Sequence, residues 1–164
     1  MTTTLKQQFG TSTSITCTLA SLASSATAGR GSAAVDNTTN LADDAMLTIS
    51  VKTSASALAN DKACYVYLYG SEDGTVYSGS SAEAPGTDAA VTIDAPTNLI
   101  GPLMISCPAS STTYTLVIGS VAALFGGVMP RKWGFVLRNY TGQALDSTEG
   151  NHQKTYTPIW WDQV

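Results

Sequence analysis

A single histidine, His152, is the one side chain that could act as an imidazole base in this sequence of 164 residues. Hydrolases that use a serine or cysteine nucleophile commonly activate it with such a base. His152 lies in the polar segment 149–154, EGNHQK, and the nearby Ser147 and Thr148 lack the context of a nucleophile elbow. We therefore expect a solvated loop histidine, and no catalytic residue is predicted.

Two pairs of adjacent acidic residues, Asp43-Asp44 and Glu72-Asp73, are the other candidates for chemistry. Neighbouring side chains in an extended segment point apart, whereas glycoside hydrolysis needs two carboxylates that face each other across a sugar. The segment 36–44 also gathers oxygen ligands of the kind that calcium takes, but its spacing matches no EF-hand loop. We predict no metal site and no cofactor, and we expect the protein not to be an enzyme.

The three cysteines, Cys17, Cys64 and Cys107, are far apart in the sequence and form no CxxC motif. Each lies in phase with apolar neighbours, which is typical of a thiol in a protein core. They are predicted to be free, buried thiols, and folding in a reducing compartment follows.

The composition excludes several classes of partner. Only 12% of the residues are charged, and the net charge is -4, so the basic surface that nucleic acid requires is missing. The opening residues 1–10, MTTTLKQQFG, do not form a secretory signal, and no apolar run approaches the length of a membrane span. We expect a soluble protein made in a cytoplasm, with no nucleic-acid or membrane partner.

Alternation of apolar and polar residues predicts strands throughout the chain. The clearest is in 131–142, RKWGFVLRNYTG, where Trp133, Phe135 and Leu137 share one face. The last segment, 154–164, is also extended, and the two segments are predicted to pair antiparallel in one sheet. Further strands are predicted at 15–19, 45–53, 63–69, 90–94, 99–106 and 113–119, with a helical turn at 120–125.

Two interruptions in this pattern carry predictions of their own. Gly101-Pro102 should mark an edge strand or a bulge, because proline donates no ladder hydrogen bond. Residues 70–88 form the longest stretch without periodicity, with a short hairpin expected around 75–77; a loop of this length is often functional.

These elements predict an all-β fold, an antiparallel two-sheet sandwich of jelly-roll type with about eight or nine short strands. The sandwich is predicted to span residues 14–164. Residues 1–13 are polar apart from Leu5 and Phe9, so we predict an N-terminal arm outside the sheets. The arm is either a flexible terminus or a segment that docks on a neighbouring subunit through these two side chains.

Aromatic residues supply the remaining candidates for partner contact. Tyr65, Tyr67 and Tyr69 form a stripe on one face of their strand, which either offers a platform to a sugar or packs against a neighbouring sheet or subunit. Successive Trp160 and Trp161 point to opposite faces of a strand, so one indole should point outward. It is either covered by a loop of the same chain or buried in an interface.

Three stretches of the sequence resemble small virion proteins of tailed bacteriophages. They are LKQQFGTSTSITCTLASLASSATAGRGSAAVDNTTN near the start, ANDKACYVYLYGSEDG in the middle and PRKWGFVLRNYTGQALDSTEGNHQKTYTPIWW near the end. The resemblance implies a β-sandwich capsid decoration (cement) protein that binds the major capsid protein, assembles as a homo-oligomer, possibly a trimer, in the host cytoplasm, and resides on the virion surface. It identifies no functional residues. The alternative is a carbohydrate-binding or host-recognition module of a tail or head fibre.

Overall fold

The computed structural model describes residues 4–163, of which strands form nearly all of the regular structure. One short helix, α1, and one 3-10 turn, η1, accompany the strands. Residues 1–3 of the predicted arm and Val164 lie outside the described residues. The elements are β1 (Leu5–Phe9), β2 (Thr13–Ser14), β3 (Ala28–Gly31), β4 (Val35–Asp36), β5 (Asp44–Lys52), β6 (Ala63–Ser71), β7 (Ala89–Thr92), β8 (Ile100–Ser106), β9 (Thr113–Ile118), α1 (Val121–Leu124), β10 (Lys132–Tyr140), η1 (Glu149–Asn151) and β11 (Gln153–Gln163).

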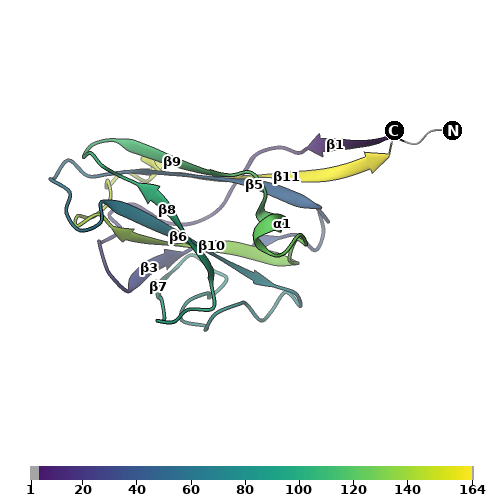
Figure 1. The fold of residues 1–164 in the computed structure, drawn as a ribbon, viewed down its shortest axis with the longest axis horizontal. Helices are drawn as coiled ribbons and strands as arrows, with labels where there is room; N and C mark the ends of the chain where they lie inside the picture. The colour runs from purple at the N-terminus through teal and green to yellow at the C-terminus, as the bar shows by residue number, and fades with distance from the viewer. Residues whose placement is uncertain (1–3, 164) are drawn as a thin grey trace.

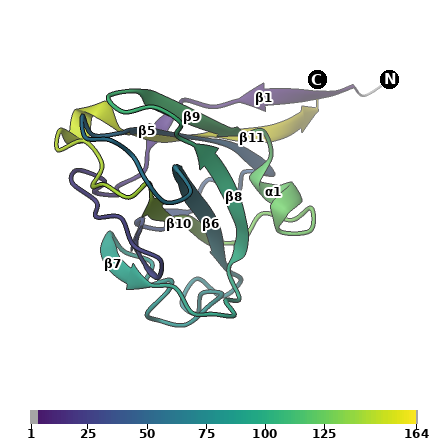
Figure 2. The same cartoon turned by 60° about the vertical axis from the view of Figure 1, so that its left-hand side comes forward.

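The strands form two antiparallel sheets that pack face to face (Figures 1 and 2). One sheet has the order β1-β11-β5-β9, with β2 also pairing with β11. The other has the order β7-β3-β10-β6-β8, with β4 also pairing with β10. The predicted all-β, two-sheet sandwich is confirmed. The jelly-roll type stays a prediction, and the strand number was underestimated because β1, β2 and β4 are short pieces of sheet without clear alternation.

The prediction that 131–142 pairs with the last segment is wrong. β10 is a central strand of one sheet, where it pairs with β6 along its whole length, and β11 is a central strand of the other sheet. The two strands meet across the core instead, where the rings of Trp133 and Tyr156 contact edge to face at 5.7 Å. Period-2 alternation identified both strands but does not specify which neighbour each one takes.

The main core lies between the sheets and follows the predicted apolar faces. Leu47, Ile49 and Val51 of β5 are fully buried, and so are Trp133 and Phe135 of β10. Antiparallel strands with one face toward a core and one toward water show this alternation. The prediction of inward faces was therefore sound for both sheets.

A second, smaller core covers the outer face of the β10–β6 sheet. Tyr69 and Val136 lie in it, packed with residues of the long segment between β6 and β8. Tyr77, from the stretch where a hairpin was expected, meets Tyr69 edge to face at 5.2 Å. The hairpin prediction is wrong, because residues 72–88 form turns rather than strands. Their role is to cover a face of the sheet.

The edge strand or bulge predicted at Gly101-Pro102 and the helical turn predicted at 120–125 are both present in the structure. β8 is an edge strand, and its register with β6 shifts between Val66 and Leu68, next to Gly101-Pro102. The helical turn is α1, whose N-cap Ser120 accepts a hydrogen bond from the Ala123 N–H. Within residues 4–163, no helix has the length and apolarity to span a membrane.

Candidate functional site

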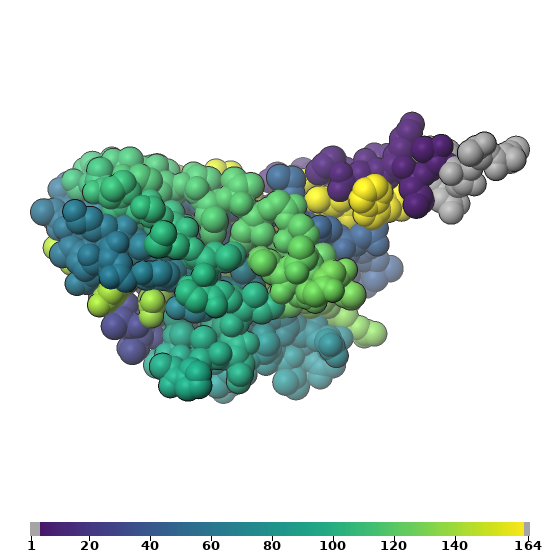
Figure 3. Space-filling view, viewed as in Figure 1, coloured from purple at the N-terminus to yellow at the C-terminus, as the bar shows by residue number. Residues whose placement is uncertain are grey.

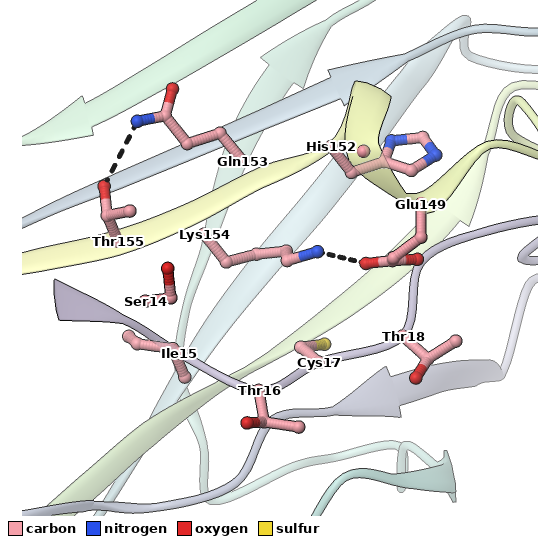
Figure 4. Close-up of a pocket in the computed structure, with 11 residues that line it drawn as sticks. Ser14, Ile15, Thr16, Cys17, Thr18, Glu149, His152, Gln153, Lys154 and Thr155 are labelled. Atoms are coloured by element: carbon pink, nitrogen blue, oxygen red, sulfur yellow. Dashed lines mark hydrogen bonds and ion pairs between the residues drawn. The ribbon is translucent and has the colours of Figure 1, made fainter.

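A polar groove of about 600 Å³ brings several reactive residue types together between the segment after β2 and the start of β11 (Figure 4). Cys17 lines one wall, and Glu149, His152 and Lys154 line the other. The Lys154 ammonium and the Glu149 carboxylate form an ion pair within that second wall. Glu149 Oε2 also accepts hydrogen bonds from the backbone N–H groups of Leu19 and Ala20, at 2.8 and 2.7 Å.

The Cys17 thiol and the His152 ring in this groove are buried, and both ring nitrogens of His152 are hydrogen-bonded. Burial raises the pKa of the Cys17 thiol to about 12, so the thiolate that a nucleophile requires is disfavoured. Both ring nitrogens of His152 are occupied, Nδ1 by the Lys52 backbone N–H at 3.2 Å and Nε2 by the Asp146 carbonyl at 3.0 Å. His152 is buried. The expectation of a solvated histidine is therefore wrong, because the end of β5 and the turn at Asp146 both bond to the ring.

The acidic side chains accept hydrogen bonds from backbone N–H groups elsewhere in the chain. Asp43 accepts a hydrogen bond from the Trp161 N–H at 2.8 Å, while Asp44 accepts one from the Ala122 N–H at 2.8 Å. The two side chains thus serve different elements, as their adjacency suggested. Asp73 accepts from the N–H groups of residues 75 and 76, and these bonds hold the pKa of its carboxyl well below the usual range. Among the described residues, no group of three or more His, Cys, Asp or Glu side chains is placed to hold a metal ion.

The three cysteines are free and buried, as predicted. Cys64 lies on β6, and Cys107 directly follows β8, the neighbouring strand of the same sheet. Cys17 lines the groove described above. The neighbouring Cys107 thiol, together with burial, raises the pKa of Cys64.

The tyrosine stripe does not form an exposed platform. Tyr69 is fully buried and donates its hydroxyl to the Ser32 carbonyl at 2.7 Å, and Tyr67 is buried beneath the second core. Only Tyr65 keeps part of its surface, stacked on the Arg138 guanidinium at 4.6 Å. Tyr67 and Tyr69 are therefore unavailable to a partner, because the segment after β6 covers them within the same chain.

The segment predicted as a free arm is part of a two-stranded ribbon. β1 pairs antiparallel with the end of β11, from Phe9 opposite Ile159 to Leu5 opposite Gln163. The ribbon leaves the body of the sandwich (Figure 1), and the pair Leu5–Gln163 is its outermost described pair. In Figure 3 the purple and yellow atoms of the ribbon project beyond the rest of the surface. The prediction that the arm has no place in the sheets is wrong.

One face of the ribbon is apolar. Gln7 lies opposite Trp161 in the register, so the side chains of Leu5, Gln7, Phe9 and Trp161 share a face. Leu5, Phe9 and Trp161 are 61%, 58% and 54% exposed. The outward indole that the sequence predicted is therefore Trp161, and among the described residues no loop encloses it. We call these three side chains the ribbon patch.

The other face of the ribbon anchors it to the body. Trp160 packs on Gly10, where an added Cβ would lie 2.7 Å from the indole ring. Its Nε1 donates to the Asn40 carbonyl at 2.9 Å. Asp43 supports the same strand, because its N–H donates to the Ile159 carbonyl at 2.9 Å and its carboxylate accepts from the Trp161 N–H. The turn before β5 thus fixes where the ribbon leaves the sandwich.

Sequence reasoning found the three side chains of the ribbon patch but not the scaffold that presents them. The polar strand β1 shows no alternation of its own, and its partner lies about 150 residues later in the chain. Comparison with models of protein families, with curated proteins and with solved structures gives no match. The resemblance to phage virion proteins is therefore a hypothesis that these comparisons leave open.

Proposed function

We propose that this protein is a non-enzymatic structural protein that attaches to a larger assembly through the ribbon. The observation that carries the proposal is the ribbon patch, in which Leu5, Phe9 and Trp161 stand exposed on one face of a projecting element. Exposed apolar side chains that cluster on a soluble protein commonly mark an interaction site, and tryptophan is enriched among the residues that dominate binding energy.

The resemblance of the sequence to phage proteins supplies the class of assembly. We propose a capsid decoration protein of a tailed bacteriophage, located on the virion surface, with the major capsid protein as its partner. Burial of the three side chains of the patch would contribute roughly 1–2 kcal/mol each, since about half of each is already covered. Contacts of this size hold a protein on a particle only when several copies act together, which suits a homo-oligomer on a repeating lattice.

The alternative, a carbohydrate-binding module, receives less support. It would use either the long loop after β6, which covers the outer face of the sheet, or the tyrosine stripe, of which Tyr67 and Tyr69 are covered by the same chain. Sugar recognition would then rest on Tyr65, which is already stacked on Arg138.

The test is to follow the protein during fractionation of phage heads and tails, with the parent chain and two triple variants. The first variant replaces the ribbon patch by serine (L5S, F9S and W161S). The matched control replaces three exposed valines elsewhere on the surface by serine. They are Val76, Val117 and Val128, which are 71%, 54% and 74% exposed. We expect the parent and the control to sediment with heads and the patch variant to remain free. A parent chain that sediments with tails, or with neither, would contradict the decoration role.

A further inference from the structure

The outer edge of β1 presents unpaired backbone groups in a defined pattern. The Gly10 N–H donates to the Pro158 carbonyl at 2.9 Å, while Phe9 is the residue directly opposite Ile159. In an antiparallel ladder this makes Phe9–Ile159 a pair that exchanges no hydrogen bonds, and the two kinds of pair alternate along the strand. Lys6 and Gln8 therefore bond to β11, and the N–H and C=O groups of Leu5, Gln7 and Phe9 point away from it.

Contacts on the opposite side of β11 agree with this assignment. The Ile159 carbonyl and the Trp161 N–H, which face away from β1 in the same alternation, both bond to Asp43. β1 ends its sheet, and no described residue pairs with its outer edge. Natural proteins commonly protect such an edge with proline, with several charges or with a bulge. β1 has a regular register and a single charged residue, Lys6.

This edge is complementary to itself. When two copies of β1 lie antiparallel about a two-fold axis at Gln7, Leu5 of each copy meets Phe9 of the other, and Gln7 meets Gln7. The outward backbone groups of the two strands then face each other, so all of them pair. Lys6 meets the uncharged Gln8, and no like charges are opposed. Because Leu5, Phe9 and Trp161 share a face, the two ribbon patches join into one largely apolar surface with the two Gln7 side chains at its centre.

We propose that the partner of the β1 edge is a second copy of this chain, joined through an antiparallel β1–β1 contact centred on Gln7. The proposal rests on the proposed function, because it takes the ribbon as the attachment element. The contact uses the strand edge and leaves the joined apolar face free for a capsid partner. A trimer, which the resemblance implies, would use a different surface, since a two-fold contact joins copies in pairs.

The contact is small compared with stable interfaces, which bury about 1,600 Å². We therefore expect association that depends on concentration, and covalent trapping is the appropriate test. Cα atoms in a hydrogen-bonded antiparallel pair lie about 5.5 Å apart, within the range of about 4.4–6.8 Å that a disulfide spans. A cysteine at position 7 meets its own copy at the axis. A cysteine at position 8 meets residue 6, and its own copy lies roughly 7 Å further along the strand, which is too far to bridge.

The experiment compares Gln7→Cys with Gln8→Cys in the full chain under mild oxidation. The native cysteines are buried, and the parent chain measures the background they contribute. We expect Gln7→Cys to form a covalent dimer at least about tenfold faster than Gln8→Cys, because only position 7 brings its own copy within the Cα–Cα range of a disulfide. Equal rates, or no dimer from either variant, would overturn the β1–β1 contact.

Two further measurements separate this proposal from the proposed function. Gln7→Pro removes the central outward donor without touching the bonds to β11, whereas Gln7→Thr keeps it. In sedimentation equilibrium Gln7→Pro should lower the self-association constant and Gln7→Thr should not; equal constants would count against the contact. If Gln7→Cys forms no covalent dimer while the ribbon-patch variant still fails to sediment with heads, only the proposed β1–β1 contact is wrong. If Gln7→Cys is trapped while that variant sediments normally with heads, attachment through the patch is wrong and the contact stands.

Discussion

The Nδ1 atom of His152 accepts a hydrogen bond of 3.2 Å from the backbone N–H of Lys52, across 100 residues of sequence. The Nε2 atom lies 3.0 Å from the Asp146 carbonyl. A neutral imidazole with its proton on Nε2 satisfies both contacts, since it accepts at Nδ1 and donates at Nε2. The ring therefore joins β5 to the segment before β11 and closes one end of the sandwich.

Replacement of His152 by alanine should destabilise the fold. It leaves the Lys52 N–H without its partner, at a cost of about 1–3 kcal/mol, while the Asp146 carbonyl keeps the hydrogen bond from the Ser21 N–H at 3.1 Å. Urea denaturation would measure the loss, with Gln153→Ala, at an exposed neighbouring position, as the control. Equal midpoints for the two variants would show that the histidine does not hold these segments.

Glu83 should be essential for the cover over the tyrosine face. Its buried carboxylate accepts hydrogen bonds from the N–H groups of Ser80 and Asp94, at 3.0 and 2.9 Å, and from the Thr97 hydroxyl at 2.5 Å. Burial acts to raise the pKa of Glu83, but these bonds outweigh it and hold the pKa below its ordinary value.

Glu83→Gln, in which an amide NH₂ replaces one accepting oxygen, should lower the free energy of unfolding by about 1–3 kcal/mol. It should also speed amide hydrogen exchange in residues 78–98. Glu72→Gln, at an exposed site in the same segment, is the matched control. Unchanged exchange in the Glu83 variant would show that the cover is held by apolar packing alone.

Asp88 should make stability depend on pH in the acid range. Burial acts to raise its pKa, but the Arg30 guanidinium at 2.5 Å and hydrogen bonds from Thr18 lower it from 3.8 to about 2. A carboxylate with a lowered pKa in the folded state stabilises the protein above pH 3.8, and this contribution disappears as the pH falls toward 2. It amounts to about 2 kcal/mol at neutral pH.

The measurement for Asp88 is the difference in unfolding free energy between the parent chain and Asp88→Asn, followed from pH 6 to pH 2. Because the other acidic groups are common to both proteins, they largely cancel in this difference. We expect the difference to be constant down to about pH 4 and to shrink below it. A difference that is the same at both ends of the range would remove Asp88 from the acid response.

The three thiols should react slowly in the native protein. All are buried, and burial raises the pKa of Cys17 to about 12, so the reactive thiolate is scarce at neutral pH. A maleimide or disulfide reagent should label none of them before unfolding and all three in denaturant. Rapid labelling of one native cysteine would identify a local opening that the structure does not contain.

Sequence patterns were reliable wherever one face of a strand packs against the opposite sheet. The apolar residues of β5 and β10 repeat with period 2 for this reason, and this signal is local. The sequence carried no comparable signal for pairing. β10 and β11 read as partners because both are long and aromatic, but strands of this kind fit either sheet equally well.

The sequence predicted the side chains of the candidate site but not their arrangement in space. Leu5 and Phe9 stood out as apolar residues in a polar segment, and the adjacent Trp160 and Trp161 implied one outward indole without showing which of the two it is. The burial of Tyr69 and His152 depends instead on how non-periodic segments fold back, the cover around Glu83 and the turn that contains Asp146. Neither segment is periodic, so neither could be assigned to a face before the fold was known.

The pairing of β1 with β11 also sets when the ribbon can exist during synthesis. β1 leaves the ribosome well before its partner residues 159–163, because about 150 residues separate the two strands. Until β11 has emerged, β1 has no strand to pair with, and the ribbon patch is not assembled. A chain in which β11 has not yet been translated therefore lacks the paired ribbon that presents Leu5, Phe9 and Trp161 on one face.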